Sequence, residues 1–457
     1  MNDRGKNGIS YMTTGRLAPK IILFALPLAA TAILQQLFNA ADVAVVGTFV
    51  DKTAMAAVGC NTPIVNLLLN IFTGISLGAN VVISRAIGAG VKDAVKRGVR
   101  TAVVVSVAGG LIMAAIGELI AAPLIGMMSV PDEVLPLAIT YLRIYSAGLP
   151  VIFLYNFESA IFRSKGDTLT PLFVLLFSGL INVGLNLFFV IGLNMSVAGV
   201  ALATIISNAV SALLMFVILL TRKDEIKLTF DGKPIDGKLL KSMLKIGIPA
   251  GVQGAMFSVS NLVVQSGINS LGTDVMAAAS AAFNVESIAY FVINAFGQAA
   301  TTFTSQNLGA GKLDRCKRTV LLTNVIAIIS SLVCALILII PGRFLLSLFN
   351  NDPAVIELGF IRLVMIAATE FINGINEIFS GILRGHGISL GPAIMTFLGV
   401  CVFRMIYIFT VFKAVNTFMC LMIVYPASWV ITAILVISLY FIKRKSLYSP
   451  RTVIEDN

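Results

Sequence analysis

Apolar runs of twenty or more residues follow one another along this chain, with only short polar breaks between them. An α-helix needs ~20 apolar residues to cross the hydrocarbon core of a bilayer, whereas a helix of a soluble protein keeps a polar face. Of the 457 residues, 58% are hydrophobic and 12% are charged; the charged share is about half that of an ordinary soluble domain. The chain is therefore predicted to be an all-α integral membrane protein.

The apolar runs predict twelve transmembrane helices. The first twenty residues are polar and lead straight into a full-length span, so we expect no cleaved signal peptide. The predicted spans are residues 21–49, 54–83, 100–128, 134–161, 172–193, 197–220, 246–270, 276–304, 319–349, 356–383, 393–413 and 417–442.

The distribution of lysine and arginine predicts the orientation, because cytoplasmic loops carry an excess of both. If the two termini and alternate loops share one side, that side holds 27 of the 33 Lys and Arg residues. Both termini are therefore predicted to be cytoplasmic in a multi-pass plasma-membrane protein. The formal charge of +11 follows from this asymmetry and from attraction to anionic lipid headgroups, so we expect membrane lipid and no nucleic acid as a partner.

Residues for soluble catalysis or metal binding are few. The single histidine, His386, is expected at a cytoplasmic helix end, where a structural role suits it, and no catalytic Ser/His/Asp pattern or phosphate-binding glycine loop occurs. The cysteines have no CxxC spacing and support neither a disulfide framework nor a metal site. We therefore expect neither an enzyme nor a cofactor. The five cysteines are Cys60, Cys316, Cys334, Cys401 and Cys420.

Short phrases recur along the chain at a nearly constant spacing, the repeat distance. The sequence "SRAIGAGVKDAVKR" at residues 84–97 returns as "SQNLGAGKLDRCKR" at residues 305–318, and "FRSKGDTLTP" at residues 162–171 returns, at the same spacing, as "LRGHGISLGP" at residues 383–392. Pro27 and Asn39 have counterparts in Pro249 and Asn261, at a spacing longer by one position. The chain is therefore predicted to be a duplicated six-helix unit. The repeated phrases are expected to brace loops and orient helices.

The two repeats begin on the same side of the membrane, so they are parallel and related by an axis along the membrane normal. The basic, polar stretch at residues 221–245 is the one long linker between them. We predict an N-lobe at residues 1–220, this cytoplasmic linker, and a C-lobe at residues 246–457.

The order and spacing of these phrases resemble multidrug and toxic compound extrusion (MATE) transporters. The stretch "PLAATAILQQLFNAADVAVVG" at residues 27–47 and the two phrases that follow the fourth helix of each half carry the resemblance, which covers nearly the whole chain. The resemblance implies a V-shaped bundle of two lobes. It also implies ion-driven antiport of bulky, often cationic, drug-like organic compounds, and we expect the chain to act as a monomer.

Asp42 is the first candidate for the coupling chemistry, because a charge inside a membrane span is costly and usually functional. Gln35, Asn39 and Asp42 share one helix face at positions i, i+4 and i+7. Asp42 also follows Pro27 by fifteen residues, the spacing at which the family's first helix carries its essential aspartate. Such a carboxylate can exchange a proton or coordinate a sodium ion with neighbouring oxygens. The alternative is a carboxylate that caps the outer helix end.

A second polar stripe holds Asn182 and Asn186, one helical turn apart. The family has an asparagine and an aspartate at these positions, with a threonine in the next helix that corresponds to Thr204. Because Asn186 cannot titrate, Asp42 is left as the one carboxylate of the N-lobe site, and sodium loses an anionic ligand. Interhelical hydrogen bonding is the alternative role for the two asparagines.

The C-lobe departs further from the family, whose acids on the first and fourth helices of this lobe correspond here to Phe257 and Asn373. Acids nevertheless occur nearby, and we treat them with Asn261 as candidates for cation binding or proton relay: Glu286, Glu370 and Glu377. The alternative is that they form structural ion pairs with three arginines of the predicted spans: Arg143, Arg362 and Arg404.

The sequence thus predicts a secondary active exporter of organic cations or other amphipathic compounds, with the proton ranked ahead of sodium as the coupling ion. Pro27 removes a backbone hydrogen bond and gives the first helix a place to bend. A flippase for lipid-linked saccharides is the first alternative, and it would need several cationic residues for the diphosphate. A membrane-embedded enzyme or a channel is the second, although neither a catalytic cluster nor a ring of carbonyls or charges is visible.

Overall fold

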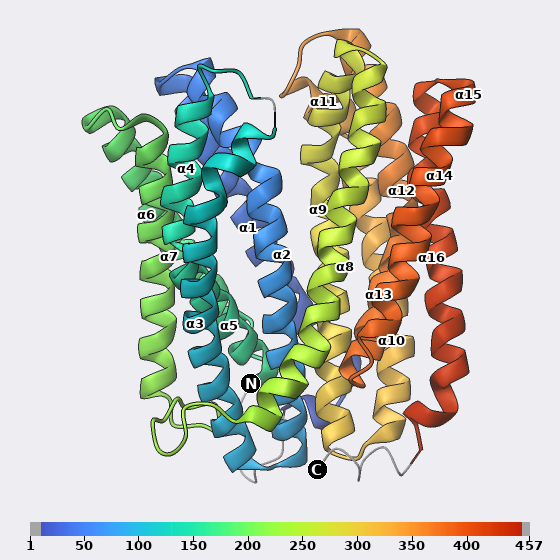
Figure 1. Cartoon of the computed structure of the whole chain (residues 1–457). Coiled ribbons are helices and arrows are strands. Elements are labelled where there is room, and N and C mark those ends of the chain that lie inside the picture. The colour runs from blue at the N-terminus through green and yellow to red at the C-terminus, as the bar shows by residue number, and fades with distance from the viewer. Residues whose placement is uncertain (1–10, 129, 450–457) are drawn as a thin grey trace. The chain divides into compact units, whose positions relative to one another are not determined.

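The computed structural model describes residues 11–128 and 130–449, which are helical, with no strand among them (Figure 1). The first half contains α1 Leu17–Phe49, α2 Lys52–Ala89, α3 Lys92–Gly126, α4 Leu135–Ala147, α5 Leu149–Lys165, α6 Leu169–Leu187 and α7 Ser196–Thr221. The second half contains α8 Gly237–Ser270, α9 Thr273–Gly309, α10 Leu313–Ile339, α11 Gly342–Ser347, α12 Pro353–Gly385, α13 Leu390–Thr396, α14 Phe403–Tyr407, α15 Lys413–Val415 and α16 Phe418–Leu447. A 3₁₀ turn η1 (Tyr11–Thr13) precedes α1, and three π-helical segments interrupt the spans: η2 Phe188–Gly192, η3 Phe397–Val402 and η4 Ile408–Phe412.

Ten of the helical stretches in the described residues are long and apolar enough to cross a membrane. Helices α4 and α5 form an eleventh when they are taken together, with a bend of 50° between them. Pro150 stands at the start of α5 and lacks the N–H that would continue the preceding helix, which accounts for the break. The twelfth expected span corresponds to α12, which is not among these stretches and which contains five charged residues: Glu357, Arg362, Glu370, Glu377 and Arg384.

The helices extend beyond the predicted apolar spans, and α8 shows why. It was expected to begin at residue 246 but begins at Gly237. The carboxylate of Asp236 accepts hydrogen bonds from the backbone N–H groups of Lys238 and Leu239, at 3.0 and 3.2 Å. These are the bonds of a helix N-cap, and they start the helix in a polar stretch that hydropathy does not detect.

The chain forms two compact units, and each unit contains segments from both halves of the sequence. One unit contains the beginning of α1 up to Ala29, Gly88–Gly90 and the chain from Pro249 onward; the other contains Ala30–Ile87 and Val91–Ile248. The boundaries inside α1 and α8 therefore fall next to Pro27 and at Pro249, the repeated prolines, both of which lie inside their helices. The opening segment of each half packs with the helices of the other half.

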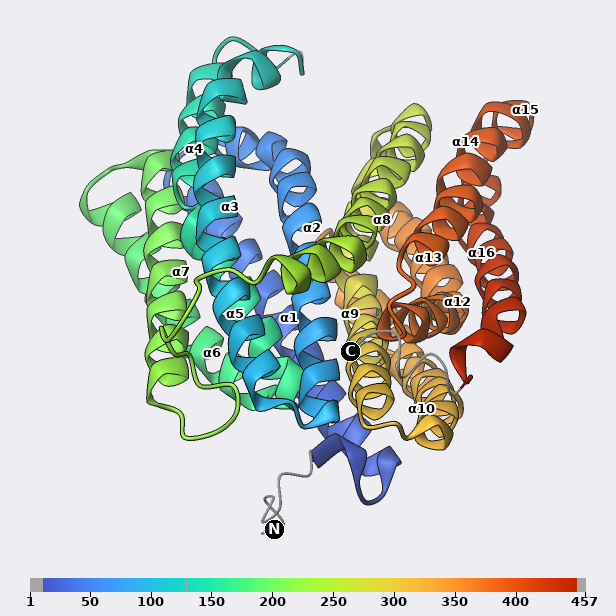
Figure 2. The same cartoon turned by 60° about the horizontal axis from the view of Figure 1, so that its bottom comes forward.

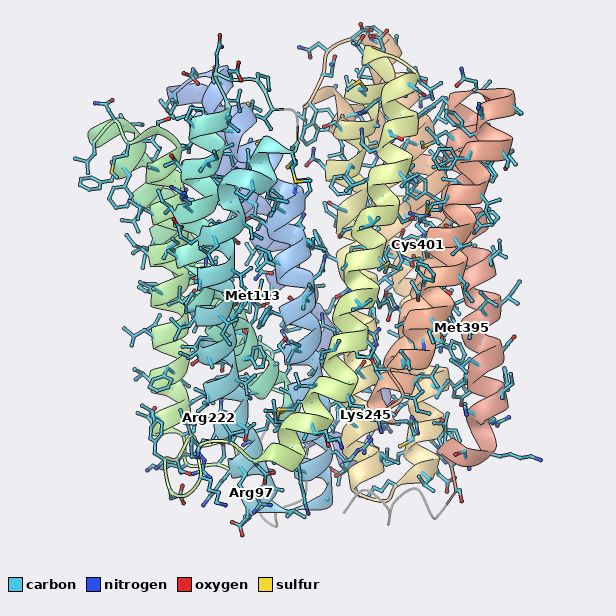
Figure 3. The ribbon with its side chains drawn as sticks, in the orientation of Figure 1. Arg97, Met113, Arg222, Lys245, Met395 and Cys401 are labelled. Carbon is cyan, nitrogen blue, oxygen red and sulfur yellow. The ribbon has the colours of Figure 1, made fainter. Side chains whose placement is uncertain are left out.

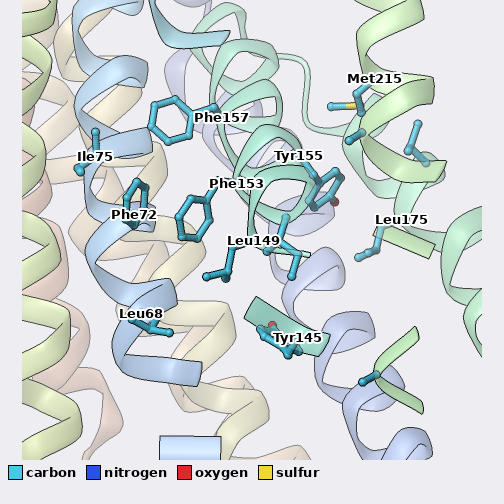
Figure 4. Packing of buried hydrophobic residues seen from close by; sticks show 14 of the residues in the cluster. Leu68, Phe72, Ile75, Tyr145, Leu149, Phe153, Tyr155, Phe157, Leu175 and Met215 are labelled. Atoms are coloured by element: carbon cyan, nitrogen blue, oxygen red, sulfur yellow. The ribbon is translucent and has the colours of Figure 1, made fainter. Parts of the chain in front are cut away.

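A continuous apolar core holds the unit of first-half helices together (Figure 4). Phe72 of α2 stacks on Phe153 of α5, with ring centroids 3.8 Å apart and ring planes 18° from parallel. Phe153, Phe157 and Leu149 of α5 are fully buried. Close packing of this kind fixes α2 against α5 through many small dispersion contacts.

The repeated phrases meet each other within each half. The hydroxyl of Ser84 donates a 3.2 Å hydrogen bond to the carbonyl oxygen of Ser164. Their counterparts in the second half form the same contact, because the hydroxyl of Ser305 donates a 3.3 Å bond to the carbonyl oxygen of Gly385. Each first phrase ends its helix at a glycine with positive φ, 73° at Gly90 and 68° at Gly311, a conformation that glycine adopts without steric cost.

The linker folds onto the cytoplasmic end predicted for the first-half helices, because Asp236 pairs with Arg97 of α3 at 3.0 Å. The backbone N–H of Asp236 also donates to the hydroxyl of Thr101 at 3.0 Å. Ile226 and Leu228 are buried. Figure 2 shows the segment between α7 and α8 running across α3, and Figure 3 labels Arg97 at this end of the unit.

Candidate functional site

Asp42 lies buried in α1, with 6% of its surface exposed, and accepts hydrogen bonds from two other helices. Nδ2 of Asn186, near the end of α6, lies 2.5 Å from Oδ1, and Oγ1 of Thr204 in α7 lies 3.1 Å from Oδ2. These residues are 144 and 162 positions away along the chain. Three helices therefore bring one carboxylate and two neutral donors together.

The partners of Asp42 have bonds of their own. Nδ2 of Asn186 also donates to Oδ1 of Asn182 at 3.1 Å, one turn earlier on α6. Oγ1 of Thr204 also lies 2.9 Å from the carbonyl oxygen of Val200. A threonine hydroxyl has one proton to donate, so it can serve the carboxylate or the carbonyl but not both at once.

The charge of Asp42 has no cationic partner, because no Lys or Arg nitrogen among the described residues lies within 4.0 Å of its carboxylate oxygens, the limit for an ion pair. A buried carboxylate of this kind is costly while ionised, since its partners are an amide and a hydroxyl. A proton or a small cation would remove that cost. Protonation of Asp42 would therefore change the charge of this site.

Gln35 and Asn39 were predicted to form a polar stripe with Asp42, and their part in an ion-coupling or substrate site stays a prediction. Gln35 and Asn39 are exposed, and no hydrogen bond between described atoms joins either of them to Asp42. Helical spacing places the three residues on one face, yet Asn186 and Thr204 cover that face only at the level of Asp42.

The acids of the second half are engaged with neighbours. Arg362 forms a forked pair with Glu286, with Nη2 at 2.6 Å and Nε at 3.2 Å from Oε1. Arg384 lies 3.2 Å from Glu377, and Glu370 accepts a 2.8 Å hydrogen bond from Asn373. The alternative of structural ion pairs is thus the observed arrangement for Glu286.

Three further residues singled out from the sequence have partners that suit a structural role. Asn261 does not lie beside an acid but accepts a 2.8 Å hydrogen bond from Arg404. The ring of His386 lies at the end of α12, where Nδ1 is 2.9 Å from the carbonyl oxygen of Ile382, as expected for a helix-end role. Arg143, the third intramembrane arginine, pairs with Glu118 at 3.1 Å, and both are about half exposed.

From the sequence, Arg404 was expected only as a partner for acids. The structure makes it the most enclosed charge among the described residues of its unit, with 1% of its surface exposed. The signal was present in the sequence as an arginine inside an apolar span. No group of three or more His, Cys, Asp or Glu residues suited to a metal ion occurs in the part of the chain that the structure describes.

Two six-helix halves with buried polar and charged side chains inside apolar spans define a multi-pass membrane transporter. The chain belongs to the MatE family, whose model matches residues 27–188 and 249–410, once in each half. The resemblance predicted from the repeated phrases and the first helix is thereby confirmed. The two matches also confirm the duplication.

Curated relatives and solved structures agree with this assignment. The chain is 26% identical over 384 residues to the probable multidrug resistance protein YoeA of Bacillus subtilis, which covers 82% of each chain. It is 27% identical over 413 residues to the probable multidrug resistance protein NorM of Thermotoga maritima, with 89% of this chain and 88% of that one covered. A MATE crystallised in complex with MaL6 has the same fold, with a TM-score of 0.89, 20% identity, and coverage of 97% of this chain and 99% of that one.

Proposed function

We propose that this transporter exports organic, often cationic, compounds in exchange for protons, with Asp42 as the coupling carboxylate. The observation that carries the proposal is a buried carboxylate held by Asn186 and Thr204 with no cationic partner among the described residues. The names of the relatives as multidrug resistance proteins support the substrate class. A plasma-membrane location with both termini cytoplasmic remains part of the proposal.

The donors around Asp42 favour a proton over sodium as the coupling ion. Both side chains that contact the carboxylate present hydrogens to it, an amide N–H from Asn186 and a hydroxyl from Thr204. A hard cation instead requires several oxygen atoms with free lone pairs. Sodium would need Asn186 to turn its amide oxygen inward, and the site has one carboxylate to compensate the ion.

The exchange follows from the charge of Asp42. One proton binds to Asp42 from the side of higher proton activity and leaves on the other side, and the substrate moves the opposite way. When the carboxyl group is neutral, the hydroxyl of Thr204 can return to the carbonyl of Val200, 2.9 Å away. Pro27 gives α1 a place to bend between the two states. The proton drives transport only because it binds the two states with different affinity.

The acids of the second half rank behind Asp42 in this proposal. Glu286 and Glu377 each have an arginine partner, so loss of either charge would leave an arginine unpaired. The arginines also bear on the flippase alternative, which needs free cations for a diphosphate. Arg143 and Arg362 are both engaged with glutamates, and among these three arginines only Arg404 has no direct acidic partner in the described residues, which favours the exporter.

The test is ethidium transport by purified protein in sodium-free phosphatidylcholine vesicles. We expect an imposed pH gradient to drive ethidium against its concentration gradient, and a protonophore to abolish the movement. Vesicles without protein give the background. Transport that requires sodium and ignores the pH gradient would overturn the proton assignment, and the absence of any ethidium movement would overturn the exporter assignment.

A further inference from the structure

The first repeated phrase of each half, residues 84–97 or 305–318, carries basic side chains that contact a segment leading into a long helix. One such segment, residues 11–16, precedes α1, and the other, residues 231–236, precedes α8. We call them the first and the second lead-in. The coupling site at Asp42 makes no use of these contacts, so they call for a role of their own.

The phrase of the second half holds the first lead-in by its backbone. Nη2 of Arg315 donates to the carbonyl oxygen of Thr14 at 3.1 Å, and Nη1 donates to that of Gly15 at 2.9 Å. Nζ of Lys312 donates to the carbonyl oxygen of Thr13 at 2.8 Å. The bonded residues are 299 to 301 positions apart, so tertiary packing alone brings them together.

Two further contacts fix the first lead-in. Nε of Arg315 donates to Oδ1 of Asn307 at 3.0 Å, which orients the planar guanidinium toward the carbonyl oxygens. Met12 is fully buried and shares an apolar cluster with Phe303 of α9. The first lead-in therefore belongs to the unit of second-half helices, which also contains α1 as far as Ala29.

The first half holds the second lead-in by its aspartates. Nε of Arg97, the last residue of the first-half phrase, lies 3.0 Å from Oδ2 of Asp236. Nη1 of Arg100, three positions later in α3, donates to the carbonyl oxygen of Asp231 and lies 3.7 Å from its Oδ1. The second lead-in therefore belongs to the unit of first-half helices, which extends to Ile248.

Each lead-in is thus held by the half that does not contain its helix. We call the two sets of contacts the first and the second clasp, after the lead-in that each one holds. The first clasp binds backbone carbonyl oxygens and the second binds carboxylates, so the two make the same connection with different chemistry. The duplicated chain has kept the connection although the bonding atoms differ, which indicates that the connection itself matters.

The clasps determine where α1 and α8 can bend. Beyond its clasp, each helix passes from one unit to the other, after Ala29 in α1 and after Ile248 in α8. Pro27 and Pro249 stand next to these crossings, and neither supplies an N–H to its helix. While a clasp holds the start of a helix, a movement of the units must change the helix angle near its proline.

We infer that Arg315 and Arg97 are positioning residues of the transport cycle, whose clasps stay closed and turn the movement of a unit into a bend of α1 or α8. The inference rests on the proposed export function and assigns it two residues that touch neither proton nor substrate. Asp42 follows Pro27 on α1, so the first clasp links the second-half unit to the coupling carboxylate. Without the clasp, the start of α1 is free to slip and the bend is lost.

The first test measures the maximal rate of pH-driven ethidium transport by the full chain in phosphatidylcholine vesicles. We expect Arg315→Gln to lower this rate about tenfold or more, the weight of one charged hydrogen bond, while ethidium binds as in the parent. Arg315→Lys keeps the charge without the fork and should fall between the two. Arg97→Gln should slow transport through the second clasp. Arg318→Gln changes an exposed arginine of the same phrase and should transport at the parent rate.

A chemical bridge separates closure of the clasp from folding. Cysteines replace Thr14 and Lys312 in a background without other cysteines, and a flexible bismaleimide joins them before reconstitution. The two positions are close, because the side chain of Lys312 reaches the carbonyl oxygen of Thr13. The bridge should leave transport by the otherwise unchanged chain intact. It should also restore the rate of Arg315→Gln, because it replaces the lost connection.

Three results would overturn the inference: transport by Arg315→Gln at the parent rate, a bridge that stops transport by the otherwise unchanged chain, or a bridge that fails to restore Arg315→Gln. If Arg315→Gln does not bind ethidium, the rate of Arg97→Gln and the bridge in the unchanged chain decide. Each result compares a variant with its parent. Transport by the parent under a pH gradient tests the proposed function separately.

Discussion

Nδ2 of Asn186 lies 2.5 Å from Oδ1 of Asp42, although 144 residues separate them in the chain. Position 186 is therefore an amide, where the family resemblance implies a second carboxylate. An amide at this distance steadies the carboxylate of Asp42 without adding charge, which leaves one titratable group in the site. The first two predictions follow from this pair.

The Asp42→Asn variant should fold and bind ethidium normally but fail to couple export to a pH gradient. The change is nearly isosteric, so a packing role would survive at a cost of about 1 kcal/mol for a weakened hydrogen bond. A coupling role would not survive, because the amide holds the site permanently neutral. The measurement is gradient-driven ethidium transport in vesicles, together with ethidium binding to the purified protein. Glu377→Gln is the matched comparison and should reduce transport less. A dead Glu377→Gln beside an active Asp42→Asn would move the coupling site to the second half.

The Asn186→Asp variant should make transport respond to sodium. The substitution places a second carboxylate in hydrogen-bond contact with the first, and two such charges are compatible only with a shared proton or a cation between them. We expect sodium to stimulate ethidium export at fixed pH in this variant and not in the parent protein. Asn208→Asp adds the same charge to α7, where the asparagine donates to the carbonyl of Thr204, and serves as the control. An unchanged sodium response in Asn186→Asp would count against the ligand argument.

Breaking the ion pair of Glu286 and Arg362 should destabilise the protein more than removing both members. Both side chains are more than nine-tenths buried, and Nη2 of Arg362 lies 2.6 Å from Oε1 of Glu286. Arg362→Met alone therefore leaves a buried carboxylate without its partner, which should lower the free energy of unfolding by about 3 kcal/mol or more. The double variant Glu286→Gln and Arg362→Met should recover much of that loss. Unfolding of the purified variants in detergent, analysed as a double-mutant cycle, measures the coupling. Additive losses would show that the pair is not a stabilising unit.

The orientation predicts which loop residues are accessible from outside the cell. Single cysteines are placed at Asp51 and Asp231 in a background without other cysteines; both positions are exposed in the structure. The Asp51 position should react with an impermeant maleimide in intact cells, and the Asp231 position only after the cells are opened. Reaction of the Asp231 position in intact cells would mean that the topology is inverted.

The amino-acid sequence by itself determined the class of protein and the order of its helices. Bilayer thickness requires ~20 apolar residues in each span, so hydropathy locates the spans, although not the residue at which each helix begins. The duplication was also readable, because corresponding positions such as Ser84 and Ser305 lie at a constant distance in the chain. Asp42, Asn186 and Thr204 were found through the family resemblance, and the structure brings these three into contact.

Only the tertiary structure decided which polar groups meet. Helical periodicity predicts which residues share a face, but it does not say which helix covers that face. Asp42 is buried against Asn186 and Thr204, whereas Gln35 and Asn39 are exposed. The choice of Glu286 as the partner of Arg362, and the absence of a direct acidic partner among the described residues for Arg404, depend on how α9, α12 and α16 pack. Contacts between residues so far apart in the chain are set by packing, and local sequence carries no direct record of them.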